Sequence, residues 1–424
     1  MILLFVIMMI LLVLGLPIAF VLGLSAMIPM ALLDYPLSTV ALTMTDGLNS
    51  FALVALPLFM LSGALMSYGS TPRIVRFVDM LFGWMPGALG SVTIASCTFF
   101  SSISGSGSAT VAAIGGVTTG DMIKQNYGRP YIASMLSAAG GLGILIPPSI
   151  PLVIYGISGG VSIARLFVAG IIPGMIIALA LIAYNTVISK RRGYGTTSRR
   201  RYTTREALRV TYDAILPLGM PVVILGGVIG GIFTPTEGAV IAVVYAFVLS
   251  AFVYRELTIR RFLDACSAAM TSSTMILFVI ACSNVFAWFI TIEDISTQIT
   301  EAFLFISQNP IILMLMITAL QLFLGTFMET SSQILITTPI LLPIVVALGY
   351  DPVHYGILLI INLIVGAMTP PLAVTLFIST RLAGIEMQDT FPDILYFIAL
   401  YVVILLLLTF FPVITMWLPT MVYG

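Results

Sequence analysis

Long apolar runs cover most of the chain, and short polar segments interrupt them at intervals. Several runs reach 20 residues or more, which is enough for a helix to cross the ~30 Å hydrocarbon layer of a membrane. The chain is 60% hydrophobic and 8% charged, whereas a soluble domain carries about 25% charged residues. The pattern therefore predicts an all-α polytopic membrane protein.

Two polar breaks and two double-proline segments coincide when the chain is shifted by 223 residues. The shift places SSISGSGSAT (101–110) near GTFMETSSQI (325–334), and GLGILIPPSIP (141–151) on IVGAMTPPLAV (364–374). Because the coincidence extends to four separated features, it predicts an internal duplication. The halves are then residues 1–189 and 210–424, joined by a basic linker at 190–209.

The basic linker sets the predicted orientation. It holds eight of the 17 Lys and Arg residues, a pattern that favours a cytoplasmic membrane anchor over nucleic-acid binding. If the linker is cytoplasmic, then successive spans place every other basic loop on the same face except the one with Arg165. The two polar breaks then enter from opposite faces, which makes the duplication an inverted repeat.

Inversion also makes a demand on the N-terminal segment. The second half opens with two apolar spans, at about 213–231 and 236–254, so the first half needs two helices that are separated near Gly15–Pro17. Residues 1–33 are short for two complete crossings at about 1.5 Å per residue. One broken span is therefore the alternative.

Each polar break lies within an apolar region, at 88–122 and 310–346, whose two ends share a membrane face. This arrangement predicts two re-entrant helical hairpins, since exposed backbone at membrane depth is tolerated where it lines a cavity. Carbonyl and hydroxyl oxygens suit a hard cation such as Na⁺, and a helix N-terminus suits a carboxylate. The alternative is that small residues pack helices closely and that the prolines only kink them.

Four further features need an interpretation. Glu329 at the second break is a candidate for cation binding or for shaping a substrate cavity, and Glu237 in TPTEG is expected to be structural, for example as a helix cap. His354 is expected to be an ordinary residue of an external loop. Segments 71–87 and 290–303 mix charged and apolar residues, which indicates interfacial helices or, alternatively, surface loops.

The motifs SSISGSGSAT, GLGILIPPS, GIFTPTEGA and GAMTPPLAV, in this order and spacing, resemble the large membrane (M) subunit of tripartite ATP-independent periplasmic (TRAP) transporters over essentially the whole chain. The resemblance implies a fold like that of the ion transporter superfamily in the bacterial inner membrane. It implies sodium-coupled uptake of an organic acid, of the sialic acid or C4-dicarboxylate class, by an elevator mechanism. It also implies two separate partners: a small TRAP membrane subunit of about four helices and a periplasmic substrate-binding protein.

The resemblance further implies site residues. The substrate is expected between the two breaks, near Ser108 and Glu329. The residues implied for Na⁺ binding form two sets, one per half: Ser104, Ser106, Ser108, Gly143, Ile146 and Pro147, and Thr330, Ser331, Ser332, Gly366, Met368 and Thr369.

Other functional classes have less support. The chain contains no HExxH motif of a metal-dependent protease and no GxxxxGK[ST] phosphate-binding loop of an ATP-driven pump, so we expect no enzymatic activity. The main alternative is a stand-alone sodium-coupled carboxylate carrier that works without a binding protein.

Overall fold

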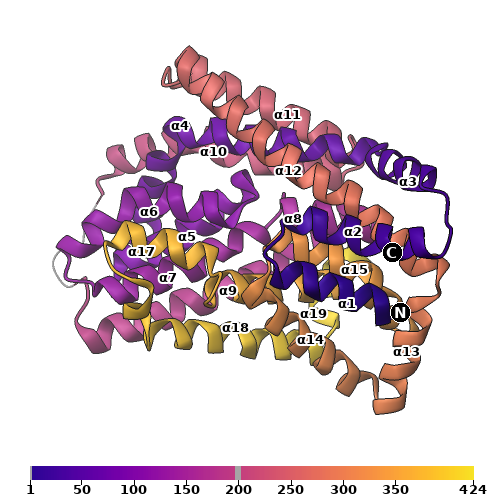
Figure 1. The fold of residues 1–424 in the computed structure, drawn as a ribbon. Helices are drawn as coiled ribbons and strands as arrows, with labels where there is room; N and C mark the ends of the chain where they lie inside the picture. The colour runs from indigo at the N-terminus through magenta and orange to yellow at the C-terminus, as the bar shows by residue number, and fades with distance from the viewer. Residues whose placement is uncertain (1, 196–201) are drawn as a thin grey trace.

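The structure is a computed structural model that describes residues 2–195 and 202–424. Within these residues every regular element is helical (Figure 1). Eight of the helices are long and apolar enough to cross a membrane. Part of the basic linker, including Arg199, Arg200 and Arg201, lies outside the described residues.

The α-helices are, in chain order, α1 (Ile2–Val13), α2 (Ile18–Leu32), α3 (Ser38–Leu48), α4 (Ala55–Phe82), α5 (Ala88–Ser104), α6 (Gly107–Lys124), α7 (Arg129–Gly141), α8 (Ile150–Gly159), α9 (Ile163–Arg192), α10 (Thr204–Ile229), α11 (Pro235–Val248), α12 (Ile259–Ile292), α13 (Ile295–Ile306), α14 (Pro310–Phe327), α15 (Thr330–Ala347), α16 (Pro352–Met368), α17 (Val374–Ala383), α18 (Asp393–Phe410) and α19 (Val413–Tyr423). Short 3₁₀ or π turns add η1 (Phe51–Val54), η2 (Leu142–Ile144), η3 (Leu249–Val253) and η4 (Met387–Thr390).

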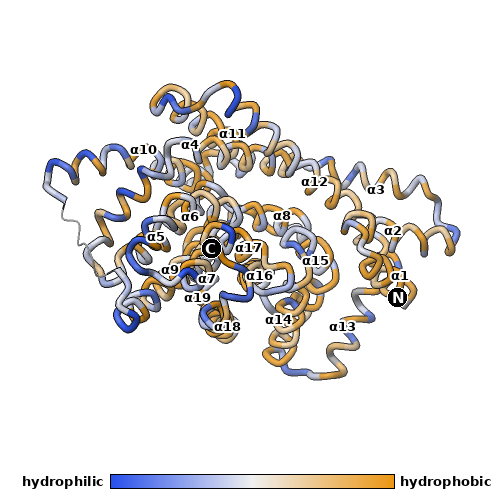
Figure 2. Tube along the Cα trace, turned by 60° about the vertical axis from the view of Figure 1, so that its left-hand side comes forward, coloured by the Kyte–Doolittle hydropathy of each residue, from blue (hydrophilic) through white to orange (hydrophobic). Residues whose placement is uncertain are grey.

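The helices form two groups that lie against each other. Helices α4, α10, α11 and α12 pack together along the upper side of Figure 1, with α2 and α3 against α12. Helices α5–α9 and α14–α19 form the second group below them. The outer helices are largely apolar, and hydrophilic residues concentrate near loops, as at the start of α10 (Figure 2).

Two helical hairpins stand at corresponding places in the second group. Hairpin 1 consists of α5 and α6, and hairpin 2 consists of α14 and α15. When the chain is shifted by 223 residues, α6 coincides with α15 from end to end. The sequence placed the hairpins at 88–122 and 310–346, and the observed helix pairs run over 88–124 and 310–347.

Helix α9 shows that the hairpins enter from opposite sides. It has 30 residues and is therefore about 45 Å long. Near its start, the Arg165 guanidinium lies 3.8 Å from the Asp351 carboxylate, which follows hairpin 2. Near its end, the Asn185 amide donates to the carbonyl of Gly87, which precedes hairpin 1 (3.1 Å). The bases of the hairpins thus lie at opposite ends of α9.

Contacts between distant loops agree with the predicted orientation. Arg73 of α4 pairs with Glu256 at 3.3 Å, and both belong to segments that the charge pattern places in the cytoplasm. The Tyr35 hydroxyl donates to Glu293 (2.8 Å), and both belong to loops that it places outside. Segments that the charge pattern assigns to one face thus lie together, as inversion requires.

The N-terminal segment is divided where the sequence predicted. Helices α1 and α2 are separated at Gly15–Pro17 and pack against each other. They have 12 and 15 residues, which is less than the ~20 that a complete crossing needs. Because the two helices pack against each other, the segment is a pair of short helices rather than one broken span.

The segments that precede the hairpins are helices and not surface loops. Helix α4 is broken at Tyr68 and Gly69, where φ of Gly69 is +83°, and it then continues to Phe82. Helix α13 likewise follows a residue in the left-handed region, Asp294, with φ of +51°. Each hairpin is thus preceded by a short helix that a backbone break separates from a long span.

The prediction for His354 was wrong. This residue lies in the first turn of α16 and is fully buried, with its Nδ1 2.7 Å from the Thr415 hydroxyl of α19. The sequence DPVHY resembles a loop because Asp351 and Pro352 begin it, but these two residues are the N-cap and first residue of α16. Glu237, in contrast, is a helix cap as expected: with Thr234 it forms a capping box at the start of α11.

Candidate functional site

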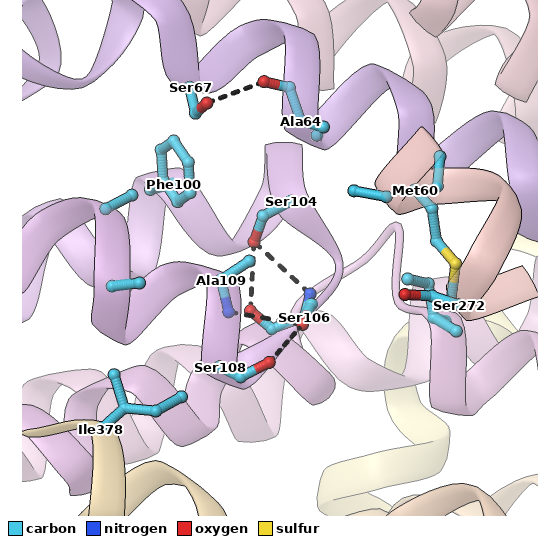
Figure 3. Close-up of a pocket in the computed structure, with 16 residues that line it drawn as sticks. Met60, Ala64, Ser67, Phe100, Ser104, Ser106, Ser108, Ala109, Ser272 and Ile378 are labelled. Atoms are coloured by element: carbon cyan, nitrogen blue, oxygen red, sulfur yellow. Dashed lines mark hydrogen bonds between the residues drawn. The ribbon is translucent and has the colours of Figure 1, made fainter. Parts of the chain in front are cut away.

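The tip of hairpin 1 is a short turn between two helices. Gly105 ends α5 with φ of +60°, a conformation that favours glycine, and Ser106 is the N-cap of α6. The Thr110 hydroxyl donates to the Ser106 carbonyl oxygen (2.9 Å). The oxygen of the Thr110 hydroxyl can therefore accept a hydrogen bond from the Ser104 hydroxyl, 2.8 Å away. The Ser106 and Ser108 hydroxyls lie 3.2 Å apart, as Figure 3 shows. Three serine hydroxyls and one threonine hydroxyl therefore converge at this turn.

Hairpin 1 rests on the segment that carries its double proline. The Ile150 amide donates to the Gly105 carbonyl (3.2 Å). A Cβ atom on Gly143 would lie 2.5 Å from the Ser106 carbonyl oxygen, which is too close for any side chain. Gly143 therefore permits the break after α7 to touch the hairpin tip through backbone alone.

The tip of hairpin 2 has the same design with a charged cap. Glu329 is the N-cap of α15, and its Oε2 accepts from the amides of Ser331 (2.8 Å) and Ser332 (3.3 Å). Glu329 is the residue on which Ser106 falls after the shift of 223. On the other side of the hairpin, a Cβ atom on Gly366 would lie 2.5 Å from the Gly325 carbonyl oxygen. Both hairpins thus touch their partner segments at a glycine.

A cavity of about 670 Å³ lies between the two groups of helices. Its walls come from hairpin 1 and from α4 and α12, with Met60 and Ser272 across from the serines in Figure 3. From the tip it extends along Ala112 and Ala113 toward the base of hairpin 1, and along α4 to Ser67. The cavity therefore extends from the hairpin 1 tip in the direction of the basic loops.

A second cavity of about 150 Å³ lies between the two tips. Ser106 and Ser108 line it from hairpin 1, and Glu329, Thr330 and Ser331 line it from hairpin 2. It shares Ser106 and Ser108 with the larger cavity, so the two adjoin. The structure thus brings together the two residues that the sequence analysis named for substrate contact, Ser108 and Glu329.

The residues named for cation binding are placed unevenly. In the first set, Gly143 touches the hairpin tip, but the Ile146 side chain points toward Gly174 of α9, so that only main-chain atoms of Ile146 remain for a ligand. In the second set, Gly366 contacts hairpin 2, the buried Met368 ends α16, and the Thr369 hydroxyl donates to its own helix at Val365 (2.6 Å).

The remaining members of these sets lie at or near the tips. Pro147 forms a cis peptide bond with Pro148 in the break below hairpin 1. Thr330, Ser331 and Ser332 form the first turn of α15 directly after Glu329.

Sequence analysis missed several residues of the site. Thr110 completes the hydroxyl cluster of hairpin 1, and its position in SSISGSGSAT was the available signal. Met60, Ser67 and Ser272 line the larger cavity from α4 and α12, but nothing in these apolar helices distinguishes them from packing residues. Only the tertiary structure shows which face of α4 meets hairpin 1.

Paired re-entrant hairpins whose polar tips meet at a cavity between two groups of apolar helices define a membrane transporter. The sequence model of the family described as "Tripartite ATP-independent periplasmic transporter, DctM component" matches residues 5–414. The chain therefore belongs to this family and is a large permease component, a multi-pass protein of the bacterial inner membrane and not an enzyme.

Three relatives illustrate the range of the family. The chain is 40% identical to the isethionate TRAP transporter permease protein DctMQ of Oleidesulfovibrio alaskensis, over 96% of this chain and 64% of that protein. It is 36% identical to the sialic acid TRAP transporter large permease protein SiaM of Vibrio cholerae, covering 90% of this chain and 89% of the relative. It is 33% identical to the C4-dicarboxylate large permease protein DctM of the same organism, covering 100% and 98%.

The fold also resembles that of a solved transporter. The YdaH transporter of Alcanivorax borkumensis matches with a TM-score of 0.64 over 95% of this chain and 98% of the other, at 14% sequence identity. At this identity the match concerns the fold alone.

Proposed function

We propose that this permease carries out sodium-coupled uptake of a small organic anion by an elevator movement of the hairpin-containing helices. The observation that carries the proposal is the meeting of two oppositely inserted hairpin tips, with Ser106, Ser108 and Glu329, at one cavity. Hydroxyl and carbonyl oxygens at such tips are suitable ligands for Na⁺. Inverted repeats with broken helices at the midplane are the usual design of secondary transporters.

The position of the larger cavity supports an alternating-access cycle. It lies between the two helix groups and extends in the direction of the basic loops, as expected of a conformation that faces the cytoplasm. Movement of the second group against α4 and α12 would close this route and open the other. Such a movement is the elevator step of the proposal.

The substrate belongs to the class of organic acids. The relatives are named for isethionate, sialic acid and C4-dicarboxylates, all of which are anions of carboxylic or sulfonic acids. We propose that a periplasmic binding protein delivers the substrate and that a separate small membrane subunit completes the permease. The tripartite family description favours this arrangement over a stand-alone carrier.

The test is uptake of labelled isethionate, sialic acid and succinate into proteoliposomes, with the sodium gradient, the small subunit and the binding protein omitted one at a time. Uptake that requires all three supports the proposal. Uptake by this chain alone would replace it with a stand-alone carrier, and uptake that does not depend on sodium would contradict the coupling.

A pair of variants tests the site itself. Ser106→Leu or Ser332→Leu is expected to abolish sodium-driven uptake at normal membrane content, because a bulky apolar side chain replaces a hydroxyl at the tip. Thr211→Leu is the control, since Thr211 is exposed on α10 and bonds only to its own helix at Ala207 (2.9 Å). Normal uptake by the tip variants would contradict the role of the hairpins.

A further inference from the structure

Charge is distributed unequally between the two tips. Among the described residues that line the two adjoining cavities, Glu329 is the single one with a formal charge. Its side chain is exposed to the cavity. Among the lining residues that the structure describes there is no lysine, arginine or histidine, so a bound anion meets one negative side chain and no positive one from them.

The two oxygens of Glu329 are used differently. Oε2 is occupied by the Ser331 and Ser332 amides, at 2.8 and 3.3 Å. Oε1 accepts a single long bond from the Ser331 hydroxyl (3.3 Å). A carboxylate oxygen has two acceptor positions, so Oε1 can receive a further hydrogen bond from the cavity. It cannot donate one while the group is ionised.

The facing tip is neutral. Ser106 and Ser108 present hydroxyls, and the backbone of Gly105 and Gly107 lines the same space. Hydroxyl groups can donate to a carboxylate or sulfonate oxygen, whereas the Glu329 carboxylate repels such a group. A substrate that bridges the tips therefore has an electrostatically preferred orientation, with its acid group toward hairpin 1.

We propose that Glu329 makes this cavity selective for monoanionic organic acids that carry a hydroxyl or ammonium group at the end opposite the acid group, and that it rejects dianions. The inference rests on the proposed function, because it assumes that an organic anion occupies this space. Selection here combines an attractive element, the free acceptor of Glu329, with a repulsive one, its charge.

Two ligands of equal chain length separate these effects. 4-Hydroxybutyrate carries a hydroxymethyl group where succinate has its second carboxylate. We expect the purified permease, together with its small membrane subunit and in the presence of Na⁺, to bind 4-hydroxybutyrate about tenfold more tightly than succinate. Thermal stabilisation measured against ligand concentration gives both affinities and does not involve the specificity of a binding protein.

The Glu329→Gln variant removes the charge and keeps an oxygen that can cap α15. We expect the preference for 4-hydroxybutyrate to fall to about threefold or less, mainly because succinate binds more tightly. The matched control is Glu237→Gln, which removes a capping carboxylate from α11 outside these cavities and should leave the tenfold preference unchanged.

The possible results separate failure of the selectivity inference from failure of the proposed function. Equal or tighter binding of succinate by the unaltered protein overturns the inference while the proposed function stands. An unchanged preference in Glu329→Gln also overturns it. If neither ligand binds in Na⁺ and isethionate and sialic acid also fail to bind, the proposed function itself is contradicted, and the inference with it.

Discussion

The two hairpins have nearly the same backbone and different chemistry. Helices α6 and α15 each contain 18 residues, and each begins after an N-cap at the hairpin tip. In hairpin 1 the cap is Ser106, and in hairpin 2 it is Glu329. The comparison shows that the halves share geometry at the backbone level, while the side chains at equivalent positions have taken different roles.

The interiors of the hairpins differ in the same way. In hairpin 2 the buried Gln333 amide donates to the carbonyl oxygen of Gln321 (2.7 Å), and the Gln321 amide donates to Thr337 (2.9 Å) and Tyr355 (3.1 Å). In hairpin 1 the position equivalent to Gln321 is Thr98, which bonds only to its own helix. Hydrogen bonds between side chains thus join α14 to α15 and α16, whereas at this position hairpin 1 has no such link.

The largest effect is expected when both tips carry a charge. Ser106→Glu places a carboxylate opposite Glu329, and we expect uptake to fall at least about 100-fold, because an anion is then repelled from both sides. The protein should still fold, since Glu329 shows that glutamate can cap the second helix of a hairpin. Uptake and thermal unfolding of the same preparation check this, and uptake near the normal rate would contradict the assignment of the substrate acid group to hairpin 1.

A smaller effect on both halves is expected from the glycine contacts. Gly143→Ala and Gly366→Ala each place a Cβ 2.5 Å from a backbone oxygen, and backbone cannot move aside as a side chain can. We expect each variant to lose about 1–3 kcal/mol of unfolding free energy, measured by denaturation in detergent. Gly116→Ala is the control because its Cβ would meet nothing within 4 Å. A loss of unfolding free energy in only one of the two glycine variants would show that the two hairpins are not packed equivalently against their partner segments.

The smallest single effect is expected for a variant of Thr98, which is compared with a variant of Gln321 in the interior of hairpin 2. Gln321→Leu removes the amide that donates to Thr337 and Tyr355 in the buried interior, and we expect a loss of about 1–3 kcal/mol in unfolding free energy. Thr98→Val removes a hydroxyl that bonds only within its helix, so a loss of about 0.5 kcal/mol or less is expected. Similar losses in the two variants would argue against the stiffening of hairpin 2 by its amide network.

The contrast between prediction and structure follows from the range of the interactions involved. The shift that places Pro147 on Pro370 can be recognised from the sequence alone, because prolines and polar segments interrupt a helix locally. His354 was misplaced because the burial of a loop-like sequence depends on α19, which lies some 60 residues away in the chain. Met60 and Ser272 were missed because the sequence of an apolar helix does not show which of its faces lines a cavity and which packs against another helix.

The sequence by itself determined the all-helical membrane class, the duplication and the residues at both hairpin tips, since hydropathy, proline and glycine express themselves through local backbone preferences. The tertiary structure decided which helices lie opposite each hairpin tip. It placed Ser108 and Glu329 at one cavity and turned Ser272 of α12 toward hairpin 1. These two outcomes depend on packing between segments more than 150 residues apart, and no local preference encodes such contacts.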